Sequence, residues 1–452
     1  MESPRSDGAT ADHDETTVVA RGREVDAPAV RTVLAELPRP TVAWSEGGEQ
    51  VVGGGAAATL TATGVDRFEA VRRAGEALFS GRSVPVELPP AARPRLFGGF
   101  AFHGGDNSTD GARKSPWAGF PGARFVLPAI QVVTEESTDR SWLVATATGA
   151  GASERAAARL DRWEDRLDSA APVAAGDGPA VTRRRYVPDE AGWRAQIGEA
   201  ADRIERGTLR KVVLAQSQTV ELDGPPSIPA VYERLSETYP DCFRFLVAPA
   251  DGGQFFGATP ERLVTRDGRT VRTEALAGSN GRGDTAAEDE WLVRELRESE
   301  KDRHEHELVV EAIKDQLGPF ARSITTGDRT VRKLATVQHL QTPITADLAE
   351  DDHVLSLVEA LHPTPAVGGL PPDEALRTIQ ETETFERGWY ASPVGWFDAA
   401  GNGTFAVGIR SAVADGRRVT LFAGNGIVAD SDPDREWNEV KLKYRPVLDA
   451  LE

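Results

Sequence analysis

Short apolar runs, separated by turns rich in glycine and proline, recur along most of the chain and constrain its fold more than any other feature. In the run at residues 210–217, successive side chains alternate between two faces, as they do in a β-strand. Similar runs predict further strands at residues 97–102, 124–128, 243–248, 255–258, 263–266, 395–397, 404–412 and 419–423. Strands therefore make up much of the expected regular structure.

Helical patterns lie between these runs. Residues 188–207 begin with Pro188, repeat apolar residues at helical spacing and end at Gly207. Further helices are predicted at residues 152–167, 288–317 and 433–451. Because long helices are scattered among many strands, we expect an α+β fold in which helices cover sheets.

The chain of 452 residues divides into three parts by composition. Residues 1–22 are polar and acidic, so we expect a mobile acidic arm. Residues 23–180 form a first part that ends in a connector rich in alanine, glycine and proline, and residues 181–452 form a second part. The three glycines at residues 53–55 are predicted to form a hairpin, because no Lys-Ser or Lys-Thr pair follows them as in a phosphate-binding loop.

Composition excludes several classes of protein. A net charge of −19 argues against binding nucleic acid, which requires clustered basic residues. No apolar run is long enough to span a membrane, and the first residues carry no secretory signal. Cys242 is the only cysteine, so neither an intrachain disulfide nor a cysteine-rich zinc site can form. We therefore expect a cytoplasmic enzyme, whose acidic surface also fits solubility at high salt.

Two ionisable residues could serve as a general base and a general acid. Lys211 begins a strand that should be buried on at least one face, and burial without a partner lowers the pKa of a lysine, as a base requires. Glu261 follows Thr-Pro at a turn between predicted strands, where apolar surroundings would raise its pKa and make it a proton donor. The alternatives are an edge lysine that reaches water and a turn carboxylate paired with Arg262.

Two pairs of carboxylates have helical spacing. Asp302 and Glu305 share one face of a predicted helix, and Glu436 and Glu439 share one face of another. Lys443 lies on the second of these faces. Two such helices could hold Mg²⁺ together with oxygens of an anionic substrate. The alternative is a pair of solvated faces that make ordinary ion pairs.

Three smaller features complete the candidates. The His-Glu-His sequence at residues 304–306 lacks the spacing of a zinc motif, so Glu305 is better interpreted as an oxygen ligand. The glycine-rich turn at residues 423–428 can offer backbone N–H groups to a carboxylate, or it is only a hairpin turn. Arg410, in a predicted strand, could bind a carboxylate through two N–H groups, or it is only an edge arginine.

The order and spacing of these pieces resemble one family of enzymes. The motifs that carry the resemblance are Lys211-Val-Val-Leu, Ala-Thr-Pro-Glu261, Leu276-Ala-Gly-Ser279, Lys301-Asp-Arg-His-Glu-His306, Leu361-His-Pro-Thr-Pro365, Gly388-Trp-Tyr390, residues 405–411 and Gly426-Ile-Val-Ala-Asp-Ser431. They resemble the chorismate-utilising enzymes, which include isochorismate, anthranilate, aminodeoxychorismate and salicylate synthases. The resemblance is dense from about residue 186 to the C-terminus and thin before it.

The resemblance implies a fold and a set of roles. The implied fold is α+β, with two large, mainly antiparallel sheets packed together, helices on the outside, and both parts of the chain intertwined as one domain. By resemblance, Glu305 and Glu439 are ligands of Mg²⁺, supported by Asp302 and Glu436. The implied contacts with the substrate chorismate are Gly278, His339, Tyr390, Arg410, the backbone amides of Gly426 and Ile427, and Lys443.

Two positions narrow the reaction that the resemblance implies. At the position of Lys211, isochorismate and salicylate synthases resemble this chain in having a lysine, whereas anthranilate synthases typically have a glutamine. Aminodeoxychorismate synthases that form a covalent intermediate need a lysine where this chain has Ala277. The resemblance therefore implies an isochorismate synthase in which Lys211 activates water and Glu261 protonates the leaving hydroxyl.

The resemblance also bears on partners and pathway. It implies an enzyme without a glutaminase subunit, present as a monomer or homodimer, that supplies menaquinone or a catecholate siderophore. A salicylate synthase and the ammonia-dependent subunit of anthranilate or aminodeoxychorismate synthase are the alternatives.

Overall fold

The computed structural model describes residues 17–26, 28–81, 88–104, 115–174, 176, 178–333 and 337–452. The strands in these ranges are β1 Val18–Val25, β2 Thr41–Glu46, β3 Glu49–Ala62, β4 Arg95–Phe100, β5 Ala123–Glu135, β6 Arg140–Thr148, β7 Val181–Val187, β8 Lys211–Leu222, β9 Phe243–Ala248, β10 Gln254–Thr259, β11 Arg262–Asp267, β12 Thr270–Gly281, β13 Ala321–Thr326, β14 Thr330–Lys333, β15 Val337–Leu348, β16 Gly369–Leu370, β17 Pro393–Asp398, β18 Gly403–Val407, β19 Ser411–Asp415 and β20 Arg418–Ile427. The helices are α1 Val30–Glu36, α2 Arg67–Phe79, α3 Ala152–Asp168, α4 Glu190–Glu205, α5 Ile228–Thr238, α6 Ala286–Glu298, α7 Glu300–Leu317, α8 Val354–Leu361, α9 Pro372–Thr382 and α10 Pro433–Leu451, with a short 3₁₀ helix, η1 Pro90–Ala92.

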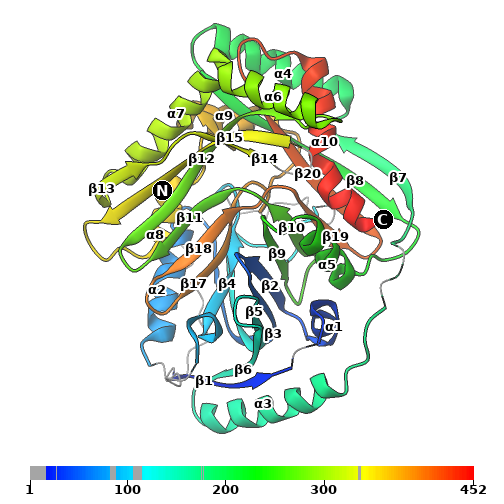
Figure 1. The fold of residues 1–452 in the computed structure, drawn as a ribbon, viewed down its shortest axis with the longest axis vertical. Helices are drawn as coiled ribbons and strands as arrows, with labels where there is room; N and C mark the ends of the chain where they lie inside the picture. Colours follow the sequence, from blue (N-terminus) through cyan, green and yellow to red (C-terminus); the bar gives the residue numbers. More distant parts are fainter. Residues whose placement is uncertain are drawn as a thin grey trace, which may run out of the picture.

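The strands of the described ranges form one hydrogen-bonded network in which every pairing is antiparallel. β5 lies at its centre, with β3 along one edge and β4 and β6 along the other. From β3 a first arm runs through β2, β9, β10, β19 and β20 to β8, and from β4 a second arm runs through β17, β18, β11 and β12 to β15 (Figure 1). The expected α+β fold with mainly antiparallel strands and helices on the outside is confirmed.

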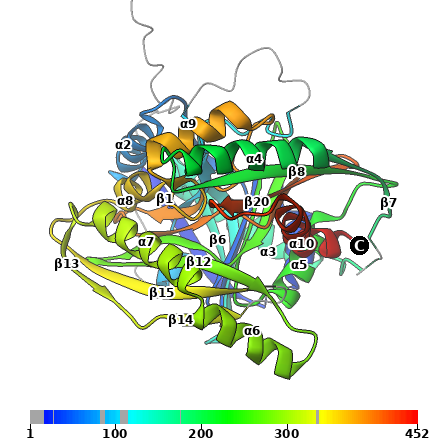
Figure 2. The same cartoon turned by 90° about the horizontal axis from the view of Figure 1, so that it is seen from above.

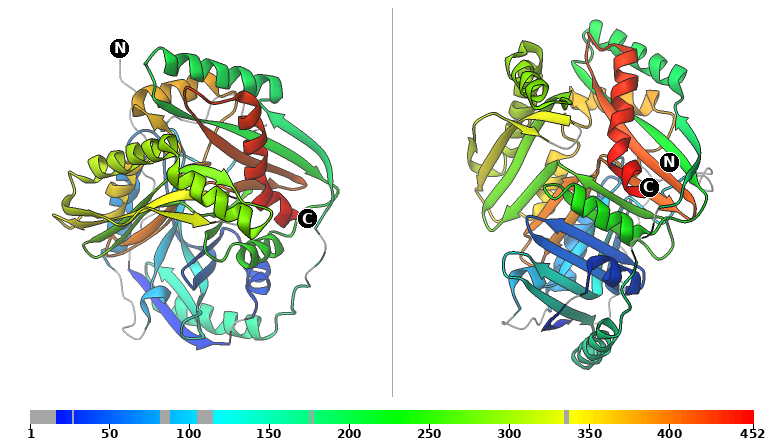
Figure 3. Two further views of the ribbon diagram at one scale, coloured as in Figure 1. Left: turned by 45° about the horizontal axis from the view of Figure 1, so that its top comes forward. Right: turned by 45° about the vertical axis from the view of Figure 1, so that its right-hand side comes forward.

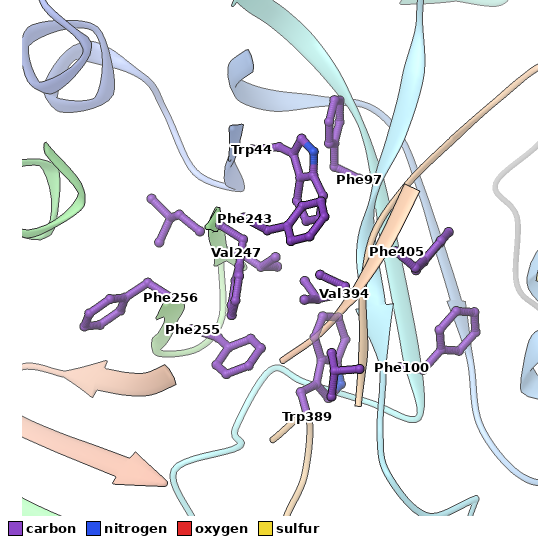
Figure 4. Packing of buried hydrophobic residues seen from close by; sticks show 14 of the residues in the cluster. Trp44, Phe97, Phe100, Phe243, Val247, Phe255, Phe256, Trp389, Val394 and Phe405 are labelled. Atoms are coloured by element: carbon purple, nitrogen blue, oxygen red, sulfur yellow. The ribbon is translucent and has the colours of Figure 1, made fainter. Parts of the chain in front are cut away.

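Apolar side chains from both arms share one core. Trp44 of β2, Phe243 of β9 and Phe255 of β10 belong to it, as do Phe97 of β4 and Val394 of β17 (Figure 4). The rings of Trp44 and Phe243 lie 5.7 Å apart, within the range where aromatic pairs add about 0.5–1.5 kcal/mol to the free energy gained by burial. Because β2 pairs with β9 and β4 pairs with β17, the two parts of the chain are joined within this network.

Helices lie against the faces of both arms. α4, α9 and α10 contact β8 and β20, whereas α6 and α7 contact β12 and β15 (Figures 2 and 3). α3 packs on β1 and β6 at the other end of the molecule (Figure 1). None of the described helices combines the length and apolar character that crossing a membrane requires. Helices α7 and α10 therefore pack on different arms.

Several predicted elements match the structure closely. The predicted helix at residues 152–167 is α3, the predicted strand at 243–248 is β9, and the predicted helix at 433–451 is α10. The last helix begins where the sequence indicated, because Pro433 occupies its first turn and the carboxylate of Asp432 accepts the N–H groups of Asp434 and Arg435.

Two element predictions are wrong in detail. Residues 53–55 do not form a hairpin but lie inside β3, because the chain already turns at Gly47 and Gly48, both of which have positive φ. The predicted helix at residues 288–317 is two helices, α6 and α7. They are separate because Ser299 leaves the helical conformation and its hydroxyl caps α7 by accepting the N–H of Asp302.

Two further predictions are also corrected. The predicted strand at residues 404–412 is interrupted between β18 and β19, so Arg410 does not lie in a strand. Most of the predicted arm at residues 1–22 lies outside the described residues. Residues 18–22, however, belong to β1, which pairs with β6 along its whole length. The arm prediction is wrong for these residues because β6 offers them a partner that the local sequence does not reveal.

Candidate active site

A cavity of about 220 Å³ lies between the far ends of the two arms. Its walls come from β8 and β20 of the first arm, β12 and β15 of the second, and one face each of α7 and α10. The loops before β11 and β19 and the segments at residues 366–367, 387–391 and 428–431 complete them. Every candidate residue from the sequence except Ile427 lines this cavity: Lys211, Glu261, Gly278, Asp302, Glu305, His339, Tyr390, Arg410, Gly426, Glu436, Glu439 and Lys443. The fold thus gathers into one place side chains that are far apart in the sequence.

Lys211 is the first residue of β8, with β20 on one side of the strand and β16 on the other. Its side chain is only 8% exposed, so the alternative of an edge lysine that reaches water is wrong. Its ammonium group donates a hydrogen bond to Oε1 of Glu305 at 2.7 Å. The assumption that Lys211 is buried without a partner is therefore also wrong, because α7 brings Glu305 to it.

Glu261 lies in the turn between β10 and β11, as the sequence predicted. Burial raises the pKa of its carboxyl to about 7, and the negative charge of Glu274 acts in the same direction. Arg262 forms an ion pair with Glu46 at 3.0 Å, so the alternative of a Glu261–Arg262 pair is wrong. A carboxyl with a pKa near 7 is about half protonated at neutral pH and can donate a proton.

Arg410 and Tyr390 form a corner of the cavity suited to an anion. Arg410 has φ 52°, and a non-glycine residue in this region costs about 1–3 kcal/mol, a strain that is found mostly at functional sites. Its side chain is buried, and this desolvation lowers the pKa of the guanidinium. Burial raises the pKa of the Tyr390 phenol, which therefore stays a neutral hydrogen-bond donor. A bound carboxylate would compensate the buried positive charge.

The carboxylates of α10 lie in the cavity wall and have polar partners there. Lys443 donates a hydrogen bond to Oε1 of Glu439 at 2.8 Å, and its positive charge lowers the pKa of Glu439. Burial raises the pKa of Glu436, whose Oε2 accepts a hydrogen bond of 2.7 Å from the amide of Asn425. Glu436 therefore does not fit the alternative of a solvated helix face. Glu439 does keep an ordinary ion pair of that kind, because its side chain is 44% exposed and its partner Lys443 lies four residues on in the same helix.

The donor chemistry of the cavity fits a hard divalent cation. In the ranges that the structure describes, no three His, Cys, Asp or Glu side chains are grouped closely enough to hold a metal ion by themselves. Mg²⁺, however, usually takes only one or two carboxylates and completes its shell with water and substrate oxygens. Glu305 and Glu439 line one cavity from two helices, and each is neutralised by a lysine. Their oxygens already bind cations, as Mg²⁺ would require.

Two glycines keep space for these side chains. Gly278 has φ 73° and lies at an irregularity in the β12–β15 pairing, where an added Cβ would be 3.1 Å from Cβ of Asp302. An added Cβ on Gly426 would be 2.8 Å from Cε of Lys211. Larger residues at these positions would displace Asp302 or Lys211, because both contacts are shorter than ordinary van der Waals distances.

The remaining candidates differ in position. His339 lines the cavity, and burial together with nearby positive charges lowers its pKa to about 3, so it is neutral at physiological pH. The side chain of Ile427 is fully buried in the core and does not line the cavity; the role implied for it concerns only its backbone amide. His306 is also buried, and its Nε2 lies 2.7 Å from the hydroxyl of Thr342. His306 is therefore a packing residue.

The sequence analysis missed a buried ion pair along the edge of β8, and Arg387 of this pair also lines the cavity. The side chains of Glu383 and Arg387 are 4% and 1% exposed. Arg387 donates from Nη2 to the carbonyl of Val213 at 2.7 Å, and Oε1 of Glu383 accepts the N–H of Ala215 at 2.8 Å. These bonds fill the edge of β8 between its neighbours β16 and β7. The only sequence signal was the spacing of four residues, which is common in exposed ion pairs.

The fold and this cavity define an enzyme, one in which a buried carboxyl group, a buried lysine and further carboxylates line a single cavity. The chain belongs to the chorismate binding enzyme family, whose sequence profile matches residues 10–452.

Individual relatives agree with this assignment. The chain is 37% identical over 448 residues to the salicylate biosynthesis isochorismate synthase of Pseudomonas aeruginosa, covering 97% of this chain and 91% of that protein. It is 35% identical over 362 residues to isochorismate synthase MenF of Bacillus subtilis, covering 80% of this chain and 75% of that protein.

Solved structures share the fold. MenF, the menaquinone-specific isochorismate synthase from Escherichia coli, superimposes with a TM-score of 0.80 at 28% identity, covering 98% of this chain and 97% of that one. Anthranilate synthase component I from Streptococcus pneumoniae, at 21% identity and a TM-score of 0.70, covers 95% of this chain and 92% of its own and shares the fold alone.

Proposed function

We propose that this protein is an isochorismate synthase, which converts chorismate to its isomer isochorismate. The observation that carries the proposal is that Lys211 and Glu261 line the same cavity. An amine and a protonated carboxyl around one cavity can act as base and acid on a substrate bound between them. The isochorismate synthases among the relatives support the same activity.

In the proposed reaction, Lys211 as a free amine takes a proton from a water molecule while the water oxygen bonds to C2 of chorismate. The ring double bonds shift and the C4–O bond breaks. The leaving hydroxyl takes the proton of Glu261 and departs as water, so one water enters, one leaves, and the product is an isomer of the substrate. The pKa of about 7 at Glu261 suits this step, because the proton is present near neutral pH and is readily given up. The lone pair of the neutral amine accepts this proton, and the amine can keep donating an N–H to Glu305 while it does so.

The two carboxylates of chorismate have separate partners in the proposal. Arg410 and Tyr390 bind the carboxylate of the enolpyruvyl group, since a buried guanidinium and a neutral phenol both donate hydrogen bonds to it. Lys443 and the backbone amides of Gly426 and Ile427 bind the ring carboxylate. His339 contacts the substrate as a neutral imidazole, and Gly278 leaves room for the ring.

Mg²⁺ belongs to the proposal as the cofactor. Glu305 and Glu439 would hold it, with Asp302 and Glu436 supporting them from the same helix faces. When bound, the cation offsets the negative charge of the substrate and fixes its carboxylate. Two negatively charged groups of the substrate could then enter a cavity that already contains several carboxylates.

Pathway and partners follow from the activity. We propose that the product supplies menaquinone synthesis, with a catecholate siderophore as a second destination. Water as the nucleophile requires no ammonia, so the proposal includes no glutaminase subunit. We also propose that the enzyme is cytoplasmic and that it is a monomer or a homodimer.

A single incubation tests the reaction. The purified protein is mixed with chorismate and Mg²⁺, and the products are separated by chromatography. Isochorismate as the main product supports the proposal. Salicylate with pyruvate would instead indicate a salicylate synthase, and anthranilate formed on addition of ammonia would indicate an anthranilate synthase subunit. Either of these as the main product would overturn the assignment.

A further inference from the structure

The turn that carries Glu261 is held on both sides by one ion pair. Arg332 of β14 donates from Nη1 to the carbonyl of Pro260 at 2.9 Å, directly before Glu261. Oε1 of Glu274, on β12, accepts the N–H of Arg262 at 3.4 Å, directly after Glu261. Arg332 and Glu274 bind each other at 3.2 Å between Nη1 and Oε1.

This pair is built into the second arm and does not lie on its surface. The side chains of Glu274 and Arg332 are 10% and 19% exposed. The amide of Gln341 on β15 donates to Oε2 of Glu274, so the second oxygen of that carboxylate is also occupied. Nη2 of Arg332 donates to the carbonyl of Asp241 at 2.9 Å. Strands β12, β15 and β14 therefore each contribute one residue to a row that ends at the Glu261 turn.

The charges that face Glu261 come from three other elements. Glu274 on β12 is negative, whereas Lys211 on β8 and Arg410 before β19 are positive. Of these, Glu274 is the one that raises the pKa of Glu261, in addition to burial, and the two cations lower it. The Thr364 side chain also acts on Glu261, by a hydrogen bond that lowers the pKa. Glu274 is thus the only one of these groups that favours the protonated acid.

We propose that Glu274 and Arg332 are positioning residues for the proton donor of this enzyme: they fix the backbone on both sides of Glu261, and Glu274 places a negative charge beside the turn that carries it. This inference rests on the proposed function, because it takes Glu261 to be the general acid. Neither residue lines the cavity, so neither touches the substrate.

Glu274→Gln tests the inference, because it keeps the shape of the side chain and removes its charge. With less negative charge nearby, Glu261 loses its proton at lower pH. The alkaline limb of the kcat–pH profile should therefore move down by about half a unit or more. The loss of activity should be several-fold at pH 8 and small at pH 6, and the KM for chorismate should change less than kcat.

The matched control is Glu46→Gln. Glu46 also forms an ion pair with Arg262, at 3.0 Å, but it contacts the side chain of Arg262 and not the backbone of the turn. This variant should keep the alkaline limb of the wild-type enzyme. An equal displacement in both variants would overturn the inference, as would an unchanged limb in Glu274→Gln.

A second variant covers the case in which Glu274→Gln folds poorly. Glu274→Asp keeps the charge and shortens the side chain, so it should restore most of the wild-type alkaline limb while kcat stays several-fold low. If the alkaline limb of Glu274→Asp moved down by the half unit or more that is expected for Glu274→Gln, the proposed role of the charge would be contradicted. The two proposals can fail separately: if Glu261→Gln is inactive and Glu274→Gln has the wild-type profile, only the positioning role is lost.

Discussion

Nζ of Lys211 lies 2.7 Å from Oε1 of Glu305, so the candidate base is held by a candidate metal ligand. The same relationship recurs between Lys443 and Glu439 at 2.8 Å. An ammonium group and a divalent cation compete for the same carboxylate oxygens. A cation bound to Glu305 would therefore release Lys211 toward the cavity, whereas Lys443 would keep its hydrogen bonds to the carbonyl of Gly424 and to Oδ1 of Asn425.

Replacing Lys211 by alanine tests the role of the base. Lys211→Ala removes the amine but leaves Arg410 and Lys443 to bind chorismate. We expect kcat to fall by at least about 100-fold, the usual contribution of a positioned base. Chorismate binding in the presence of Mg²⁺, measured by calorimetry, should persist. The control is Lys314→Ala, because Lys314 pairs with the exposed Glu311 on α7 and does not line the cavity. Normal turnover of Lys211→Ala would remove Lys211 from the mechanism.

The role of the acid can be tested in both directions of the isomerisation. Glu261→Gln cannot give or take the proton, although it keeps nearly the same shape. The same carboxyl serves both directions, so conversion of chorismate and conversion of isochorismate should each fall by about 100-fold or more. Product formation followed from each substrate by chromatography checks this. A rate near that of the wild type in either direction would refute the acid role.

The same variant also gives a prediction for stability. The pKa of Glu261 is raised from its ordinary value of 4.5 to about 7 in the folded protein, so the unfolded chain loses this proton first as the pH rises. Between these two values, wild-type stability falls with increasing pH, whereas the neutral amide of the variant has no proton to lose. The free energy of unfolding of Glu261→Gln relative to wild type should therefore rise by up to roughly 3 kcal/mol from pH 4 to pH 8. Urea unfolding at both pH values measures it. If the difference in free energy of unfolding between the variant and the wild type were the same at pH 4 and pH 8, the pKa of Glu261 would not be raised.

Local sequence patterns were sufficient for the elements that carry the site. Alternation around Lys211 predicted β8, the Thr-Pro sequence predicted the Glu261 turn, and helical spacing put Glu436 and Glu439 on one face of α10. These are short-range signals that the backbone geometry of strands, turns and helices produces directly. The motifs then predicted which of these residues belong together.

Long-range relationships could not be predicted from the same patterns. The partner of Lys211 is 94 residues away, and it becomes a partner only because β8 and α7 meet across the cavity. The apolar run around Arg410 favoured a strand, but the chain takes φ 52° there, and tertiary contacts determine such a conformation. The pairs Glu383–Arg387 and Glu274–Arg332 have the composition of ordinary surface ion pairs, and only the fold buries them.

The metal proposal predicts a specific loss at Glu439. Glu439→Gln removes one charge from the proposed Mg²⁺ ligands, so the Mg²⁺ concentration for half-maximal activity should rise by about 10-fold or more. Calorimetric titration with Mg²⁺ in the presence of chorismate gives a readout independent of turnover. Glu311→Gln on α7 is the matched control, because Glu311 is 64% exposed and pairs with Lys314 outside the cavity. Equal Mg²⁺ dependence in both variants would contradict the assignment of Glu439.

The buried pair Glu383–Arg387, on the edge of β8, predicts a loss of rate that exceeds its effect on binding. Glu383→Gln weakens the hold on Ala215 and Arg387, and a small shift of β8 displaces Lys211 from the water that it activates. Misplacement by about 1 Å can cost 100-fold in rate, so we expect kcat to fall by about 10-fold or more while the KM for chorismate stays within about 3-fold. Asp289→Asn is the control, since Asp289 is a similarly buried carboxylate, paired with Lys333 at 2.7 Å but away from the cavity. Both variants should lower the melting temperature, but only Glu383→Gln should lower kcat at a temperature where both are folded. Equal kcat values in the two variants would show that the pair stabilises the fold without positioning Lys211.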